Sequence, residues 1–284
     1  KRQSIDKDRL NELGAYSLLL GGLRTVDGET TAIETIASEV RIATSGNDLA
    51  ADALQGPELL LTASSNLTIA AGSLLAANAD VPTQNFLLDG DGAFLRVAGG
   101  AQASLERQGS LSRSQGDLIL EQGALLSGRS LILDATHDNL LDGTLQLFNI
   151  GAVAGGGALS ISANRINLIG DGSHPTDGLS LDNASIAGFG DLDQLRLTSY
   201  STLDLYGPAV LGSASLKDLV IAAAGIAGHG ENGVTAQILA ESVRFENPNP
   251  DSAVFVPGAA LGDGKLQVQA QTLTFGDNAT EAMR

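Results

Sequence analysis

The sequence predicts an all-β fold, a right-handed parallel β-helix (solenoid), with a short helical excursion near the N-terminus. Three observations support this prediction. Short segments alternate apolar and polar side chains, glycine-rich corners separate these segments, and stretches far apart in the chain share one repeat pattern.

The alternating segments run from residue 59 to residue 275. A period of two is typical of β-strands, because successive side chains of a strand point to opposite faces. We expect the apolar side chains to point inward in stacked ladders and the polar ones to face outward. The predicted strands are residues 59–63, 67–70, 94–97, 118–121, 131–134, 145–147, 159–163, 166–168, 179–181, 195–197, 203–205, 219–221, 243–245, 266–268 and 273–275.

Glycine, often beside Asp or Ser, marks the corners between strands and supplies the positive φ angles that sharp bends need. Two repeat units can be aligned at these glycine corners. Residues 157–170 read GALSISANRINLIG and residues 264–277 read GKLQVQAQTLTFGD, and residues 193–207 follow the same plan with one extra residue. Each unit consists of two short strands joined by a bend.

Antiparallel β architectures also use many short strands, but the turns argue against them. Hairpin-type pairs such as Asp142-Gly143 and Asn232-Gly233 do not alternate regularly with strands long enough to form a sandwich. Strands this short suit a coil that stacks on its neighbours, with roughly 20 to 25 residues per coil.

Helical patterns occur only near the N-terminus. In residues 4–13, Ser4 is a candidate N-cap and Gly14 a stop signal, and residues 32–40 show a second pattern. No change of composition marks a domain boundary. We therefore expect one β-helix segment over residues 1–284, with a helix-containing leader or excursion within residues 1–30.

Composition excludes several classes of function. The chain has 16 Lys and Arg against 33 Asp and Glu, and its net charge of −17 repels nucleic-acid phosphates and anionic membranes. The absence of cysteine excludes thiol catalysis, disulfides and cysteine-ligated zinc. The apolar runs are too short to span a bilayer. We expect no nucleic-acid binding, no membrane insertion and no cofactor.

Several stretches resemble large filamentous-haemagglutinin-type exoproteins of Gram-negative bacteria. They are residues 13–24 (LGAYSLLLGGLR), 56–77 (GPELLLTASSNLTIAAGSLLAA), 90–107 (GDGAFLRVAGGAQASLER) and 123–136 (GALLSGRSLILDAT). The resemblance implies two-partner secretion, in which an outer-membrane transporter passes the unfolded exoprotein to the cell surface. It also implies a non-catalytic structural or adhesive shaft segment of a longer secreted protein, with a host-cell, glycan or neighbouring-cell receptor.

The family's secretion domain is recognised partly through Asn-Pro-Asn motifs. Asn247-Pro248-Asn249 matches this motif, but it lies near the C-terminus without the surrounding domain. We therefore do not assign the secretion role to it.

The alternative function is a polysaccharide-active β-helix enzyme, a lyase or glycoside hydrolase, whose carboxylates would project from adjacent coils. The best candidates are Asp89, Asp91, Asp171 and Asp177, all in glycine-rich loops where Asp is a common corner residue. The chain has no Trp and three Tyr, which provide few rings for stacking sugars. Residues 89–92 (DGDG) lack the spacing of acidic residues found in an EF-hand or a β-roll, which argues against calcium binding there.

The three histidines, His137, His174 and His229, lack metal-ligand spacing and are predicted to be solvated loop residues. We therefore assign no catalytic, cofactor-binding or metal-binding residue. The sequons at Asn66, Asn183 and Asn278 are candidate glycosylation sites.

Overall fold

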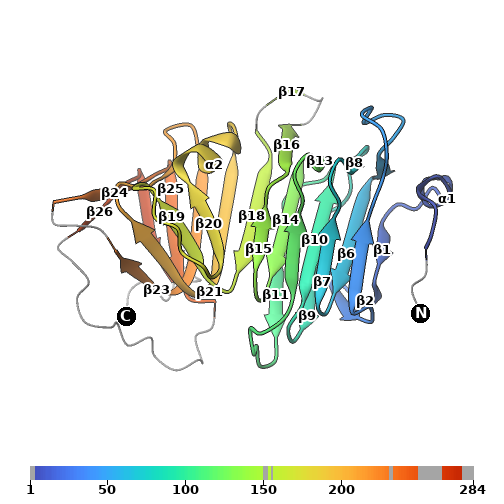
Figure 1. The fold of residues 1–284 in the computed structure, drawn as a ribbon, viewed down its shortest axis with the longest axis horizontal. Helices are drawn as coiled ribbons and strands as arrows, with labels where there is room; N and C mark the ends of the chain where they lie inside the picture. Colours follow the sequence, from blue (N-terminus) through green and yellow to red (C-terminus); the bar gives the residue numbers. More distant parts are fainter. Residues whose placement is uncertain (1–3, 150–152, 155, 230–232, 249–263, 277–284) are drawn as a thin grey trace. The chain divides into compact units, whose positions relative to one another are not determined.

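The structure, a computed structural model, describes residues 4–149, 153–154, 156–229, 233–248 and 264–276 (Figure 1). Strands make up 54% of it and helices 5%, and most strands pair in parallel and in register. The chain falls into two compact units, Lys1–Ala158 and Leu159–Arg284, which we call unit 1 and unit 2. None of the described helices is long and apolar enough to cross a membrane.

The described part of unit 1 contains one helix, α1 (Lys7–Glu12), and four groups of hydrogen-bonded strands. Sheet A holds β1 (Leu18–Leu20), β6 (Glu58–Ala63), β10 (Ala93–Ala98) and β14 (Ser130–Ala135). Sheet B holds β2 (Gly22–Asp27), β3 (Thr30–Thr35), β9 (Asn85–Asp89) and β11 (Leu105–Gln108). Sheet C holds β4 (Glu39–Ile42), β7 (Asn66–Ile69), β12 (Asp117–Leu120) and β15 (Asn139–Leu141). Sheet D holds β5 (Leu54–Gly56), β8 (Leu74–Ala77), β13 (Leu125–Gly128), β16 (Thr144–Asn149) and the short β17 (Val153–Ala154).

Sheets C and D show a repeating path of the chain. In sheet C, β12 pairs in parallel with β7 on one side and β15 on the other, which places Leu118 between Leu67 and Asn139. In sheet D, β13 pairs in parallel with β8 and β16. The chain passes from β12 to β13, β14 and β15, so it visits sheets C, D and A before it returns to sheet C. One such passage, which we call a circuit, therefore stacks directly on the previous one.

One strand of sheet A runs in the opposite direction. β10 is antiparallel to both of its neighbours, β6 and β14, and Leu95 lies between Leu61 and Leu133. The chain enters β10 from β9 and leaves it to β11, and these two strands pair in parallel in sheet B. The prediction of a uniformly parallel stack is therefore wrong at β10.

Sheet B also contains a hairpin that the sequence analysis did not predict. β2 and β3 are antiparallel, and the turn between them includes Gly28, whose φ of 60° favours glycine. β3 then pairs in parallel with β9. Sheet B is thus built from segments that leave the circuits.

Sheet A is buried on both faces, because residues of sheet B pack against it. β6, β10 and β14 contain only buried residues. On one face Leu61, Leu95 and Leu133 form a fully buried aliphatic ladder. We call the other face, which packs against sheet B, the outer face of sheet A. The cluster shared by the two sheets consists of Ile33, Leu60, Phe86, Leu88, Phe94, Ala103 and Ile132.

Two buried ion pairs lie in this second layer. Arg96 Nε donates to Glu58 Oε1 at 2.7 Å, and Arg96 Nη1 donates to Ser130 Oγ at 2.7 Å. Arg107 of β11 reaches Asp134 of β14, with 2.7 Å between Nε and Oδ2. Burial lowers the pKa of the Arg96 guanidinium, and Glu58 opposes this shift. These pairs connect β6, β10, β11 and β14.

The described part of unit 2 contains α2 (Asn183–Gly188) and two groups of strands. Its main sheet holds β18 (Ala158–Ala163), β19 (Ile166–Ile169), β20 (Leu179–Asp182), β21 (Gln194–Tyr206), β23 (Asp218–Gly228), β25 (Ser242–Glu246) and β27 (Thr272–Phe275). The smaller sheet F holds β22 (Val210–Gly212), β24 (Thr235–Leu239) and β26 (Lys265–Gln269). β21, β23, β25 and β27 pair in parallel, and so do the strands of sheet F.

The main sheet of unit 2 contains aliphatic ladders with regular spacing. Leu195, Leu219 and Val243 are register partners on successive strands, and all three are buried. Each step along the chain lies within the roughly 20 to 25 residues predicted for one coil. The predicted inward-facing residues of the first repeat unit, Leu159, Ile161, Ile166 and Leu168, are also buried.

All the predicted strands are confirmed as strands, but the helix predictions need correction. α1 begins after Asp6, whose side chain accepts a hydrogen bond from the Asp8 N–H, so Ser4 is not the N-cap. The second predicted helix, residues 32–40, is wrong, because these residues belong to β3 and β4. The sequence analysis also missed α2, which is capped by Asp182.

Candidate functional site

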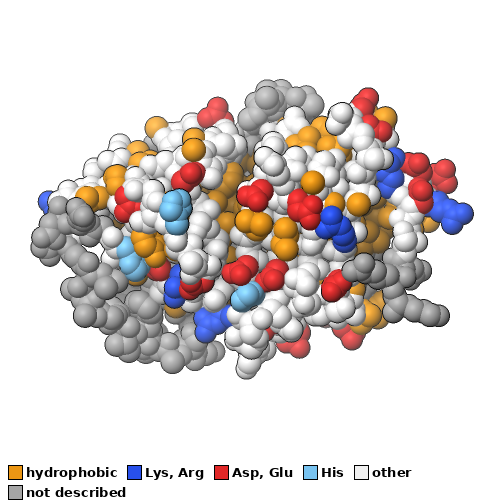
Figure 2. All heavy atoms as spheres, in the orientation of Figure 1, with side chains coloured by type: hydrophobic (Ala, Val, Ile, Leu, Met, Phe, Trp, Pro, Cys, Tyr) orange, Lys and Arg blue, Asp and Glu red, His pale blue; other side chains and the backbone are white. Residues whose placement is uncertain are grey.

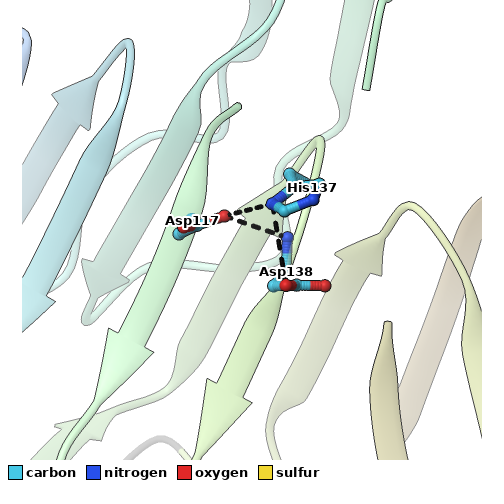
Figure 3. Close-up of side chains that lie close together, drawn as sticks. All are labelled: Asp117, His137 and Asp138. Carbon is cyan, nitrogen blue, oxygen red and sulfur yellow. Dashed lines mark hydrogen bonds and ion pairs between the residues drawn. The ribbon is translucent and has the colours of Figure 1, made fainter. Parts of the chain in front are cut away.

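The clearest cluster of titratable groups in unit 1 lies where the chain enters sheet C. Asp117 begins β12, and His137 and Asp138 directly precede β15, which pairs beside β12 (Figure 3). Gly116, just before Asp117, has a φ of 97°, and an added Cβ would lie 2.5 Å from Thr136 Oγ1. The chain can make this close turn only with glycine, which fixes the place of the Asp117 carboxylate.

The imidazole and the two carboxylates point toward one another in Figure 3. His137 Nδ1 lies 2.7 Å from Asp117 Oδ1 and 3.6 Å from Asp138 Oδ2, and the Asp138 N–H donates to Asp117 Oδ1 at 3.2 Å. The hydrogen bond to Asp117 raises the pKa of His137, and the charges of Asp138, Asp117 and Asp91 raise it further. All three side chains are partly exposed.

This triad can hold a proton or, after losing that proton, a divalent metal ion. Each residue offers one ligand atom, and these atoms lie within 4.8 Å of one another. Imidazole and carboxylate ligands suit zinc and similar metals. A metal would have to displace the proton that His137 Nδ1 shares with Asp117, so binding would weaken at low pH.

A second cluster lies in unit 2, on the polar side of β19, β21 and β23. Asn167 is the register partner of Asp204, and Tyr206 lies two residues further along β21 on the same face. His229 follows β23, and its ring stacks on that of Tyr206 with 4.4 Å between centroids and 7° between planes. Arg165 completes the cluster, with Nη1 3.1 Å from Asp177 Oδ2.

Asp204 is the centre of this cluster, and its side chain is only 5% exposed. Its Oδ2 lies 3.5 Å from His229 Nε2 and 3.6 Å from Arg165 Nε, which are ion-pair distances too long for good hydrogen bonds. Burial raises the pKa of the Tyr206 hydroxyl, and the charges of Asp204, Asp177 and Asp171 raise it further, against Arg165. The site is therefore partly desolvated and negatively charged.

The predicted acidic residues are divided between the two units. Asp89 and Asp91 belong to unit 1, and Asp171 and Asp177 to unit 2. Asp91 accepts from the Arg113 N–H at 3.2 Å and from Ser112 Oγ, and Asp171 accepts from the Ser173 N–H at 2.9 Å. These two carboxylates thus accept hydrogen bonds from loop backbone N–H groups, as predicted for corner residues. Asp177 instead joins the Asp204 cluster.

His174 is exposed in a loop, as predicted. His137 and His229 also lie in loops, but each is only partly exposed and lies beside an aspartate. A sequence signal exists for the first pair: Asp117 and Asp138 hold equivalent positions before Leu118 and Asn139, which are register partners one circuit apart. That signal is visible only when the repeat register is known.

The remaining candidates occupy ordinary positions. Asn66 lies in β7, where its Nδ2 donates to Ser65 Oγ at 3.2 Å, and Asn183 Oδ1 accepts from the Val210 N–H at 2.9 Å. Asn278 and Asn249 lie outside the described residues, while Asn247 and Pro248 follow β25.

A scan against protein-family models, a search of curated proteins and a search of solved structures each find no match to the chain.

Proposed function

We propose that this chain is a structural and adhesive shaft module, built as a right-handed parallel β-helix, of a secreted exoprotein of the filamentous-haemagglutinin type. The observation that carries the proposal is the stacking of parallel strands in register, with aliphatic ladders such as Leu195, Leu219 and Val243. Such stacking produces a repetitive core in which each circuit contacts mainly its neighbours. This architecture suits an extended surface shaft.

The last described strands support a role in a longer stack. β26 and β27 each pair with one strand only among the described residues, and their ladder positions Leu266, Leu273 and Phe275 are exposed by 39%, 48% and 60%. Together with Phe245 and Ile221 they line an apolar hollow of about 330 Å³. Unpaired strand edges and exposed ladder residues are the surface on which a further circuit adds by parallel pairing.

The negative charge of the chain argues against a role with nucleic acid and suits a long soluble surface. The net charge is −17, and Asp and Glu side chains are spread over the face drawn in Figure 2. A high negative charge keeps a long surface soluble and prevents stacking of unrelated copies. In the proposed role an outer-membrane transporter of the two-partner type exports the full-length protein, and the receptor is a host-cell, glycan or neighbouring-cell molecule.

The polysaccharide-active enzyme stays the second candidate, and the Asp204 cluster is the observation in its favour. Asp204, Arg165, His229 and Tyr206 combine acidic, basic and aromatic side chains on one face. Acid–base chemistry would require Asp204 to lie within hydrogen-bond reach of the reacting proton of a bound polysaccharide.

The test of the shaft role is surface labelling of intact cells that produce the full-length protein. An antibody against residues 1–284 should label unpermeabilised cells, and external protease should remove the signal. A periplasmic protein serves as the control for cell integrity. Signal found only after permeabilisation would contradict the proposal. Incubating labelled cells with polysaccharides and measuring released reducing ends or unsaturated products separates the enzyme candidate.

A further inference from the structure

Two carboxylates become direct neighbours at one step of sheet C. Glu39, Asn66 and Asp117 are successive register partners at the start of β4, β7 and β12. Asp138 takes the next place, directly before β15. Asn66 separates the first two carboxylates, whereas Asp117 and Asp138 have no neutral residue between them. Like charges on adjacent strands repel and destabilise a sheet, so a cation at this step would stabilise the stack.

His137 adds a nitrogen ligand at the same step (Figure 3). Its Nδ1 lies 2.7 Å from Asp117 Oδ1 and 3.6 Å from Asp138 Oδ2. A metal ion with bonds of about 2.0–2.2 Å to nitrogen and oxygen brings adjacent ligand atoms to about 3.3–3.6 Å in a tetrahedral site. The three ligand atoms of the structure lie within 4.8 Å of one another. Small rotations of the side chains therefore suffice to bind one ion.

The three ligands are open to solvent. The side chains of His137, Asp117 and Asp138 are 37%, 31% and 49% exposed, so an ion can reach them without a cavity or an opening of the fold. The charges that act on the His137 ring come from Asp138, Asp117 and Asp91. All three are negative, and they attract a cation to this place.

The backbone holds the ligands in place before an ion arrives. The Leu118 N–H donates to the Asp138 carbonyl at 2.9 Å. The His137 N–H donates to the Gly116 carbonyl at 3.3 Å. The Asp138 N–H donates to Asp117 Oδ1 at 3.2 Å. Because the two segments are already joined, metal binding has only side chains to order, which lowers its entropic cost.

The donor set selects the class of metal. One imidazole nitrogen and two carboxylates suit zinc and other divalent first-row transition metals. Calcium and magnesium prefer oxygen ligands, and calcium takes six to eight of them. The two carboxylate charges beside a neutral imidazole balance the charge of a divalent ion.

We propose that Asp117, His137 and Asp138 form a site for a divalent transition metal ion of the zinc class, which cross-links two circuits of unit 1. β15 is three residues long, and among the described residues it pairs only with β12. An ion bound by Asp117 on one side and by His137 and Asp138 on the other would hold this edge strand on the stack. The inference goes beyond the shaft role and does not depend on it.

The test is isothermal titration calorimetry of the whole chain, free of any histidine tag, with zinc chloride. We expect one saturable site with a Kd on the order of 10 μM, and calcium chloride should bind at least about tenfold more weakly. In amide hydrogen exchange followed by mass spectrometry, saturating zinc should slow exchange in residues 139–141 at least about tenfold, because a bound ion opposes local opening of β15.

His137→Gln and Asp117→Asn should each raise the Kd for zinc at least about tenfold, because each removes one ligand. The matched control is His174→Gln, which removes an exposed loop histidine of unit 2 and should leave zinc binding unchanged. Far-UV circular dichroism checks that each variant is folded, and Asp138→Asn is the further variant if one of the first two does not fold.

Three results would overturn the proposal. The first is the absence of saturable zinc binding up to about 1 mM, which is far above the expected Kd. The second is zinc binding that His137→Gln leaves unchanged, since the ion would then lie elsewhere on the acidic surface. The third is a tighter Kd for calcium than for zinc. Zinc binding without slower exchange in residues 139–141 would overturn the cross-link between the circuits.

Discussion

Glu58 and Arg96 in unit 1, and Asp204 in unit 2, all lie on the side of a sheet that is opposite an aliphatic ladder. In unit 1 the side chains of Glu58 and Arg96 are 5% and 0% exposed beneath sheet B, and their ion pair is 2.7 Å long. In unit 2 Asp204 is equally buried, but its neighbours Arg165 and His229 are partly exposed and stand too far away for hydrogen bonds.

The difference shows how a second sheet changes the surroundings of a charged side chain on the sheet that it covers. Under sheet B, the apolar cluster shared with sheet A excludes water, so Glu58 and Arg96 must neutralise and hydrogen-bond each other. Beside Asp204 the side chains of Arg165 and His229 are 39% and 28% exposed, and Asp204 Oδ1 has no hydrogen-bond partner among the described residues. The same kind of strand thus yields a structural clamp in one unit and a candidate binding site in the other.

The largest expected effect comes from breaking the Glu58–Arg96 ion pair, which we call the clamp. Arg96→Ala leaves Glu58 buried without its cation and should lower the free energy of unfolding by about 3–5 kcal/mol. The double variant Glu58→Leu/Arg96→Met should recover most of this loss, because it removes both charges and keeps the volume. Urea denaturation of the three chains measures the effect. A loss from Arg96→Ala no larger than that from Arg41→Ala, at an exposed pair, would show that the clamp does not stabilise the fold.

The inward ladders should behave alike in the two units, in contrast to the outer faces. Leu95→Ala in unit 1 and Ile161→Ala in unit 2 each delete a fully buried side chain and should cost about 2–5 kcal/mol. Leu140→Ala, at a half-exposed position of β15, is the control and should stay within about 0.5 kcal/mol. Thermal unfolding followed by circular dichroism compares them. A loss in one unit only would mean that the units do not share one kind of core.

Asp204→Asn should sharpen the comparison by having little effect on stability. The carboxylate makes no short hydrogen bond to a described residue, so the substitution should change the free energy of unfolding by less than about 1 kcal/mol. Glu58→Gln is the matched variant in unit 1 and should cost clearly more, since it weakens a buried ion pair. If the two substitutions were equally destabilising, Asp204 would be a clamp rather than a site.

The smallest effect concerns His137 and depends on pH. The raised pKa of His137 means that the folded state binds its proton more tightly than the unfolded state, whose pKa is near 6.5. The stability that His137 adds over His137→Gln should be fully present below pH 6.5 and disappear as the pH rises through the folded pKa. Denaturation of both chains between pH 5 and pH 9 measures this difference. A difference that grows with pH would contradict the assignment of the Asp117 hydrogen bond.

The positions of the strands could be predicted from the sequence, but the direction of β10 could not. An alternating pattern such as residues 93–98 has the same period read forward or backward, so it predicts a strand without its sense. The helix predicted for residues 32–40 failed for a related reason. Ile33, Ile36 and Val40 have helical spacing, but Ile33 is buried in β3 with Thr31, while Val40 belongs to β4 after a bend.

The candidate sites were harder to predict because they depend on register between circuits. Asp117 and His137 are one circuit apart, and His229 follows β23, which pairs with the strand that carries Asp204. Residues 85–108 interrupt the regular repeat between β8 and β12, so the register cannot be counted along the chain through that interval. Single residues such as His137 therefore look isolated in the sequence.

The reversed strand also has a consequence for the order in which the chain can fold. β10 hydrogen-bonds to β6 on one edge and to β14 on the other, so β14 can join sheet A only after β10 has paired with β6. A chain that emerges N-terminus first must then hold β6 as an open edge until β7, β8 and β9 have been passed and β10 pairs with it. Progress along unit 1 is consequently a stepwise process with one late-closing step, rather than the uniform zipping of identical circuits.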